Sequence, residues 1–279
     1  MVHITAEAVK RFRQRTGLPL MDCKRALQEA EGDEEKAIEN LRRRGEKLAM
    51  SRADRETAFG RFGIWAGIDK PAGAMVELKC ESAPVAQTDE FVQLANDMAQ
   101  ALAAADSEIE STEALLELPL PGDSNKTLGE QKQDLFNRIR EVFNVGRFAR
   151  LPGPTGGYSH NAGTVSGVLV QVEGGTDEAA YDVAMHIAGM RPTVLRVEDL
   201  DPELVAKERS ILTDAVQQEG KPPNIAEKIV EGRLRSGLYA DHVLLEQPFV
   251  KDNKLSIADY LKQHGMKIVR FVHWELGRE

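Results

Sequence analysis

The stretch ITAEAVKRFRQRTGLPLMDCKRALQEAEGDEEKAIENLRRRG, residues 4–45, predicts three short helices with clear start and stop signals. Thr5 is a good N-cap for the first helix, which must end before Pro19 because proline disfavours its continuation. Gly32 ends the second helix, and Asp33 caps a third helix that Gly45 closes. Three helices this short bury little apolar area, so the bundle is either marginally stable alone or docked on the rest of the chain.

The sequence after residue 56 changes from helical spacing to alternation. Apolar residues alternate at 62–68 and again at 76–80, on either side of a turn-rich segment at 69–73. This pattern predicts a β-hairpin. Asp89 then caps a helix that continues to about residue 104.

The order of strand followed by helix occurs twice along the chain. The first instance lies at 74–104 and the second at 164–190, with little residue identity between them. Between them, the turn-rich 119–125 precedes a helix that a capping box opens at Thr127. We therefore expect two related subdomains that join near residues 151–157.

Residues 202–236 predict a helical hairpin. Two helices, at 202–219 and 224–236, are separated by Gly-Lys-Pro-Pro at 220–223. A break of four residues allows consecutive helices to lie antiparallel, and their narrow apolar stripe suits a protruding pair, although an ordinary core element is the alternative.

The C-terminal part predicts a short helix at 256–264 and a strand at 266–276, in which Ile268, Val272 and Trp274 alternate. The predicted fold class is α+β, with helices packed on small antiparallel sheets. We expect an N-terminal domain with its linker at 1–55, core subdomains at 56–150 and 151–279, and the hairpin inserted at 201–238.

Composition narrows the function classes. The 279 residues include 36 Lys and Arg against 45 Asp and Glu, and the net charge of −9 argues against a direct nucleic-acid binder. No apolar run approaches the roughly 18 residues of a membrane span, and the start does not resemble a signal peptide. With only two cysteines, we expect a cytoplasmic protein that makes no membrane contact.

Motifs for catalysis and cofactor binding are missing from the sequence. There is no glycine-rich phosphate loop ending in Lys-Ser/Thr, no metal-ligand spacing among the six His and two Cys, and no nucleophile elbow. Cys23 is open to two interpretations, a nucleophile or a packed helix residue, and packing is favoured because no positive charge is placed to activate it. We expect no cofactor, no metal and no enzymatic activity, but binding to another protein.

Several motifs together resemble the elongation factor Ts family over essentially the whole chain. They include Arg15-Thr16-Gly17, Met21-Asp22-Cys23-Lys24, Gly32-Asp33, Cys80-Glu81, Asn144 with Arg147, Tyr158-Ser159-His160 and Gln247-Pro248-Phe249-Val250. The resemblance implies a ubiquitin-associated (UBA)-like N-terminal domain, a two-subdomain core and an inserted coiled coil. It also implies nucleotide exchange on elongation factor Tu, which the family binds in its GDP-bound and nucleotide-free forms.

The resemblance also assigns partner contacts to individual positions. Arg13, Leu20 and Met21 are the implied contacts of the N-terminal domain, and His160 is that of the second subdomain. The residues themselves leave alternatives open: Leu20 and Met21 can be core, Arg13 can be solvated, and His160 can be a hydrogen-bonding strand end.

The loop after Cys80 departs from the family pattern. Members usually have Thr-Asp-Phe-Val, whose Asp and Phe push between partner helices and upset the magnesium and phosphate site. The partner-binding run here is Ser82-Ala83-Pro84-Val85, which lacks both the carboxylate and the ring. The alternative function is therefore a protein that holds or stabilises elongation factor Tu with weakened exchange. Phe59 and Phe62 are candidates to replace the lost wedge, with core packing as the other interpretation of both.

Overall fold

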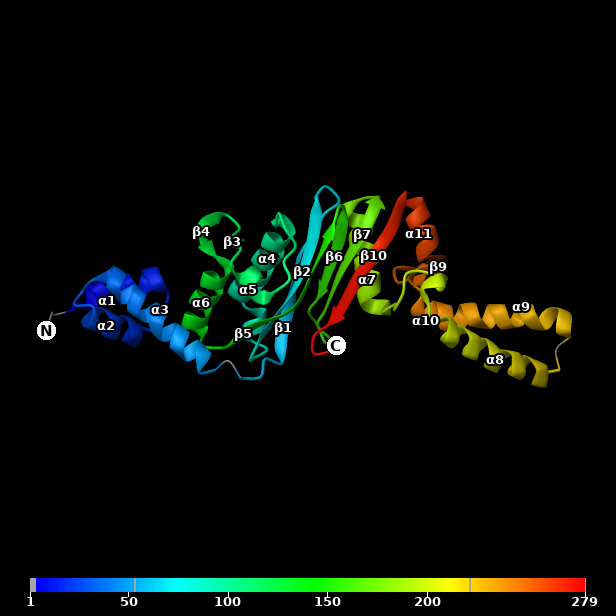
Figure 1. The fold of residues 1–279 in the computed structure, drawn as a ribbon, viewed down its shortest axis with the longest axis horizontal. Helices are drawn as coiled ribbons and strands as arrows, with labels where there is room; N and C mark the ends of the chain where they lie inside the picture. Colours follow the sequence, from blue (N-terminus) through cyan, green and yellow to red (C-terminus); the bar gives the residue numbers. More distant parts are fainter. Residues whose placement is uncertain (1–3, 53, 221, 279) are drawn as a thin grey trace. The chain divides into compact units, whose positions relative to one another are not determined.

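The computed structural model describes residues 4–52, 54–220 and 222–278 of the chain (Figure 1). It confirms the α+β class, with several helices and small antiparallel sheets. The chain forms two compact units, one made of Met1–Gly63 and Val76–Phe148 and the other of Ile64–Met75 and Ala149–Glu279. Each unit is described by itself.

The first unit begins with the three predicted helices, α1 (Ala6–Thr16), α2 (Leu20–Glu29) and α3 (Glu34–Met50). The Thr5 side chain accepts a hydrogen bond from the Ala8 N–H at 3.2 Å, as an N-cap should. The helices enclose a small core of Val9, Phe12, Leu18, Cys23, Ala26, Leu27, Ala30, Ala37 and Leu41. Cys23 is fully buried there, so the packed interpretation of this cysteine is confirmed.

The prediction that Gly45 closes the third helix is wrong, because α3 continues to Met50. A Cβ atom at position 45 would overlap the Asn137 side chain on α6 (Leu128–Ile139). Glycine here therefore allows two helices to approach closely, and the helix tolerates the propensity cost of about 1 kcal/mol. Tertiary contact, rather than a stop signal, explains this residue.

Strands β1 (Phe59–Trp65), β2 (Ala72–Cys80) and β5 (Phe143–Pro152) form one sheet in the order β1-β2-β5. Most of its residues belong to the first unit, while one end of each strand belongs to the second. The predicted hairpin at 62–80 is thus confirmed. The remaining elements are η1 (Val85–Gln87), α4 (Asp89–Ala104), α5 (Thr112–Leu116), β3 (Pro119–Leu120), β4 (Asp123–Thr127) and α6. Thr88, rather than Asp89, caps α4, since its hydroxyl accepts from the Phe91 N–H at 3.4 Å.

The second unit contains β6 (Thr155–His160), β7 (Ser166–Gly174) and β10 (Met266–Glu275), in the order β10-β7-β6. Helix α7 (Asp177–Met190) lies against β6 and β7 (Figure 1). Its other small elements are η2 (Val197–Asp199), η4 (Leu244–Glu246), β8 (Pro248–Phe249), β9 (Asp252–Ser256) and α11 (Ile257–Gln263). Val168, Val170 and Val172 of β7 pack on Val183 and Ile187 of α7 in one apolar core.

The predicted repeat of strand and helix extends further than the sequence indicates. Along the chain, the order of a β-hairpin, a helix, a two-stranded ribbon, a second helix and a final strand occurs twice, from β1 to β5 and from β6 to β10. The ribbons end alike: the Leu128 N–H donates to the Leu118 oxygen at 3.0 Å, and the Ile257 N–H donates to the Gln247 oxygen at 2.9 Å. The ribbon at 119–127 replaces what the sequence indicates only as a turn.

The predicted helical hairpin is confirmed as α8 (Pro202–Gln218) and α9 (Pro223–Leu234), which lie side by side (Figure 1). A π-helical turn (Arg235–Tyr239) and α10 (Ala240–His242) follow it. The hairpin and the segments on either side of it share one core cluster, whose buried residues are Leu200, Val216, Val230, Leu234, Tyr239 and Val243. Arg233 pairs with Glu219 across the two helices at 2.8 Å.

The predicted alternation of the last strand fails at a β-bulge. Ile268 pairs with Val172 and Arg270 with Gln171, which leaves Val269 without a partner in the register. One extra residue inverts the alternation beyond it, so Phe271 packs on the core where Val272 was expected.

Candidate partner-binding site

Leu20 and Met21 are exposed to solvent at the start of α2. They are 48% and 62% exposed, which is unusual for side chains of this size. Pro19 precedes them with φ −55° and ψ 140°, an extended entry that turns the first helical residues outward. The core alternative for these two residues is therefore wrong, and they form an exposed apolar pair.

Arg13 is exposed on α1 between two arginines that are already paired. Arg11 and Arg15 each contact Glu34 at 2.8 Å. Within residues 4–52, 54–220 and 222–278, no carboxylate pairs with Arg13. Its guanidinium is thus the one of these three that remains open to an external acceptor.

The loop after β2 is a tight turn whose outermost residue is Pro84. Pro84 is exposed, while Ala83 and Val85 are half-buried. The Ala86 N–H donates to the Ser82 oxygen at 3.3 Å and the Gln87 N–H to the Pro84 oxygen at 3.2 Å. Proline at φ −59° begins the short helix η1, so the apex is fixed before any partner arrives.

Two carboxylates hold this loop against the start of β5. Glu141 accepts from the Ser82 N–H at 3.0 Å and from the Ser82 hydroxyl at 2.6 Å. In the opposite direction, Glu81 accepts from the Val142 N–H at 2.8 Å and pairs with Arg55 at 3.0 Å. Partial burial works to raise the pKa of Glu81, but the Val142 N–H and Arg55 outweigh it and lower that pKa.

Cys80, at the base of the loop, is not a reactive thiol. Burial raises its pKa to about 11, and its Sγ donates a hydrogen bond of 3.3 Å to the Ser82 oxygen. A thiol with such a pKa stays protonated near neutral pH and is a poor nucleophile. Cys80 therefore packs and orients the loop.

The loop and α2 are held by adjacent residues at one corner of the first unit. Arg140, which ends α6 with φ 67°, contacts Asp22 of α2 at 3.2 Å, and its own oxygen accepts from Arg52 at 2.7 Å. Glu141, the next residue, holds Ser82. Sequence reasoning missed both residues, and the only local signal is an arginine where a glycine or asparagine usually ends a helix.

His160, at the end of β6 in the second unit, is half-buried and hydrogen-bonded. Its Nδ1 lies 3.1 Å from the Tyr158 hydroxyl, and Tyr158 contacts the ring of Tyr181 at 5.4 Å between centroids. The hydrogen-bonding alternative is therefore confirmed, and the exposed part of the ring remains free for a further contact.

The two phenylalanines considered as wedge replacements differ. Phe62 is 1% exposed and belongs to the core, as its packing alternative states. Phe59 is 44% exposed at the start of β1, so the expectation of core packing is wrong for this residue. Phe59 is an apolar side chain of the first unit that is open to a partner.

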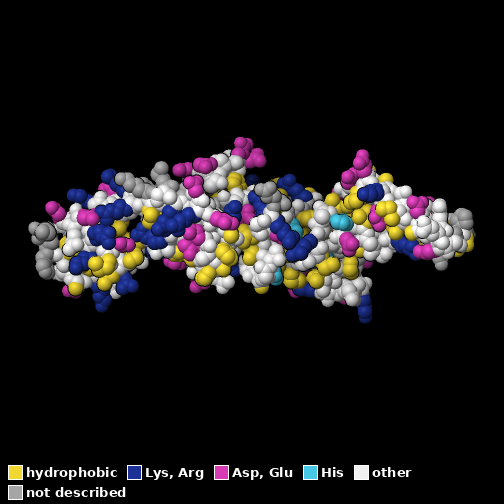
Figure 2. Space-filling model, turned by 90° about the horizontal axis from the view of Figure 1, so that it is seen from below, with side chains coloured by type: hydrophobic (Ala, Val, Ile, Leu, Met, Phe, Trp, Pro, Cys, Tyr) yellow, Lys and Arg dark blue, Asp and Glu magenta, His cyan; other side chains and the backbone are white. Residues whose placement is uncertain are grey.

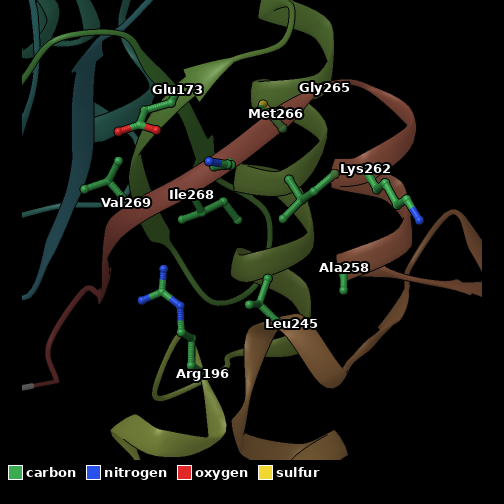
Figure 3. A pocket seen from close by; sticks show the side chains of 11 residues that line it. Glu173, Arg196, Leu245, Ala258, Lys262, Gly265, Met266, Ile268 and Val269 are labelled. Atoms are coloured by element: carbon green, nitrogen blue, oxygen red, sulfur yellow. The ribbon is translucent and has the colours of Figure 1, made fainter.

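A groove of about 770 Å³ lies in the second unit beside β10 and α11 (Figure 3). Its floor is apolar, with Leu245, Met266 and Ile268, while Arg196 reaches toward it and Lys262 extends away from it. This lining lacks a convergent set of acids, bases and nucleophiles such as a reaction centre needs.

Three further features of the described residues concern metal ligands, long apolar helices and surface charge. Among residues 4–52, 54–220 and 222–278, no three His, Cys, Asp or Glu side chains gather closely enough to bind a metal ion. In the same part of the chain, no helix is both long and apolar enough to cross a membrane. On the face that Figure 2 shows, Lys and Arg side chains are interspersed with Asp and Glu.

The fold and these exposed residues define an α+β protein of two repeated units that presents contact surfaces. Comparison with known sequences identifies its family. The sequence model described as Elongation factor TS matches residues 81–278. Elongation factor Ts of Saccharopolyspora erythraea is 39% identical over 282 residues and covers 100% of both chains. The Methylococcus capsulatus protein of the same name is 40% identical, over 98% of this chain and 92% of its own.

A third relative, elongation factor Ts of Aquifex aeolicus, is 37% identical and covers 98% of each chain. The chain therefore belongs to the elongation factor Ts family and is a translation elongation factor. The resemblance read from its motifs is confirmed.

Proposed function

We propose that this chain binds elongation factor Tu and promotes the exchange of GDP for GTP. The observation that carries the proposal is the family match along almost the entire chain. The chain contributes no covalent step in this proposal, and its place of action is the cytoplasm.

Exchange by surface contact follows from thermodynamic linkage. If the factor binds the nucleotide-free partner more tightly than the GDP-bound one, GDP weakens factor binding by the same ratio. A nucleotide held with nanomolar affinity is worth about 12 kcal/mol, so exchange needs several kcal/mol of differential contact. An energy of this size calls for several contact regions, which supports roles for Arg13, Leu20, Met21, His160 and the loop at 82–85.

The loop is where we expect the contact that distinguishes the two forms of the partner. Burying a phenylalanine contributes roughly 2–3 kcal/mol and a proline appreciably less, so the wedge here is smaller than the usual one. Its compensation is rigidity, because Pro84 has a fixed φ and little conformational entropy to lose on docking. We propose that Pro84 and Val85 form the wedge and that exposed Phe59 adds apolar contact.

Stopped-flow release of a fluorescent GDP analogue from the cognate elongation factor Tu tests the proposal. We expect the wild-type chain to accelerate release in a saturable manner. The double substitution Ala83→Asp with Pro84→Phe restores the usual wedge and should raise the saturating rate further. No acceleration by the wild-type chain at saturating concentration would refute exchange.

The same experiment distinguishes the alternative of a holding protein. In that case the chain and its partner form a complex on gel filtration while GDP stays bound. A large gain in release rate from the double substitution alone would then identify the native loop as an inactive wedge.

A further inference from the structure

We infer that Glu141 is a positioning residue for the exchange loop at 82–85, and that Arg140 beside it ties the same corner to α2. This inference rests on the proposed function, because it assigns the residue that positions the loop for contact with elongation factor Tu. Glu141 itself need not touch the partner.

The contacts between the loop and the corner are reciprocal. Glu141 accepts both polar hydrogens of Ser82, at 3.0 and 2.6 Å, with a different carboxylate oxygen for each. Glu81 in turn accepts from the Val142 N–H at 2.8 Å. Glu81 and Ser82 are thus bonded to Glu141 and Val142 at adjacent points, and these bonds restrict both translation and rotation of the loop. Bonds to an ionised acceptor are about twice as strong as neutral ones.

Position matters more for this loop than for a bulkier one. Ala83 and Pro84 offer little area and no charge, so their effect on a partner depends on where the apex stands. A misplacement of about 1 Å at a functional site can cost on the order of a hundredfold in rate. The carboxylate that fixes Ser82 is therefore expected to act on the release rate.

Arg140 links this corner to the exposed apolar pair on α2. Its guanidinium contacts Asp22 at 3.2 Å, and Asp22 directly follows Leu20 and Met21. The Arg52 guanidinium also donates to the Arg140 oxygen at 2.7 Å. The corner thus orients two candidate contact regions, the apolar pair on α2 and the loop at 82–85. We expect Asp22 to affect the affinity for the partner and Glu141 to affect the rate of GDP release.

The test measures two quantities for each variant in the full chain: the concentration for half-maximal stimulation of GDP release, and the saturating release rate. Glu141→Ala should lower the saturating rate at least tenfold and change the half-maximal concentration less than threefold. Glu141→Gln keeps one acceptor oxygen and should be intermediate. Asp22→Asn should show the opposite split, a higher half-maximal concentration at an unchanged rate. Glu110→Ala, at an exposed glutamate of the same unit, is the control.

Amide hydrogen exchange of residues 80–87 provides a readout that does not need the partner. Glu141→Ala should accelerate hydrogen exchange in this segment. Ser82→Ala removes only the hydroxyl donor, so the backbone N–H at position 82 should stay protected. A wild-type saturating rate in Glu141→Ala, or unchanged exchange at 80–87, overturns the inference. If the wild-type chain does not accelerate GDP release, the proposed function is refuted. Hydrogen exchange at residues 80–87 still tests separately whether Glu141 holds the loop.

Discussion

Replacing His186 by leucine tests how the Gln247-Pro248-Phe249-Val250 motif is held in the second unit. His186 is fully buried on α7. Its Nδ1 accepts from the Val250 N–H at 3.2 Å, so the neutral ring carries its proton on Nε2 and donates to Gln247 Oε1 at 3.0 Å. The single ring therefore bonds the side-chain acceptor at the first residue of the motif and the backbone donor at its last residue.

The expected cost follows from these two bonds. His186→Leu leaves the buried Gln247 oxygen and the part-buried Val250 N–H without this partner, at about 1–3 kcal/mol each. Burying leucine in place of imidazole returns roughly 1–2 kcal/mol. At mid-range the two losses sum to about 4 kcal/mol, so the net destabilisation should be about 2–3 kcal/mol, a factor of roughly 30 to 150 in the unfolding equilibrium.

Urea unfolding followed by tryptophan fluorescence measures this change directly. Both tryptophans of the chain, Trp65 and Trp274, belong to the second unit, so the signal reports on the part that contains His186. His264→Leu is the matched control, because His264 is an exposed histidine of the same unit. A midpoint within error of the control would refute the reasoning.

The pH dependence supplies a second check with a definite sign. Burial lowers the pKa of His186, although its bond to Gln247 works in the other direction. The unfolded histidine, with its ordinary pKa near 6.5, then binds a proton that the folded one resists, so stability falls as pH falls below about 6.5. His186→Leu should flatten this part of the curve. His273, whose pKa is also lowered by burial, continues to contribute a slope in both proteins. An unchanged slope in the variant would contradict this account.

Two other substitutions separate stability from binding. Leu234→Ala removes a fully buried side chain from the helical hairpin core and should cost about 2–4 kcal/mol locally. Hydrogen exchange should accelerate in α8 and α9 while β7 stays protected, and equal acceleration of β7 would show that the hairpin does not open on its own. Met21→Ala removes an exposed side chain and should change the free energy of unfolding by less than about 0.5 kcal/mol. It should weaken binding to elongation factor Tu by about 1–2 kcal/mol in a titration, and unchanged affinity would remove Met21 from the interface.

Part of the candidate site could be predicted from the sequence. Pro19 before Leu20 indicates an exposed turn, and the structure places Leu20 and Met21 at the surface. The contiguous run at 82–85 is a loop, as its composition indicates. The residues that hold these regions were not predictable, because Asp22 and Arg140 are 118 residues apart and Ser82 and Glu141 are 59 apart.

The sequence by itself determined the elements whose signals are local: the cap at Thr5, the capping box at Thr127 and the hairpin break at 220–223 each depend on a few adjacent residues. Tertiary structure alone decided that Gly45 continues a helix, that Val269 bulges and that Glu141 grips Ser82. Each of these outcomes depends on the shape or charge of a segment far along the chain. Propensity and periodicity describe only the residue's own neighbourhood, so they carry no information about such a partner until the fold brings it into contact.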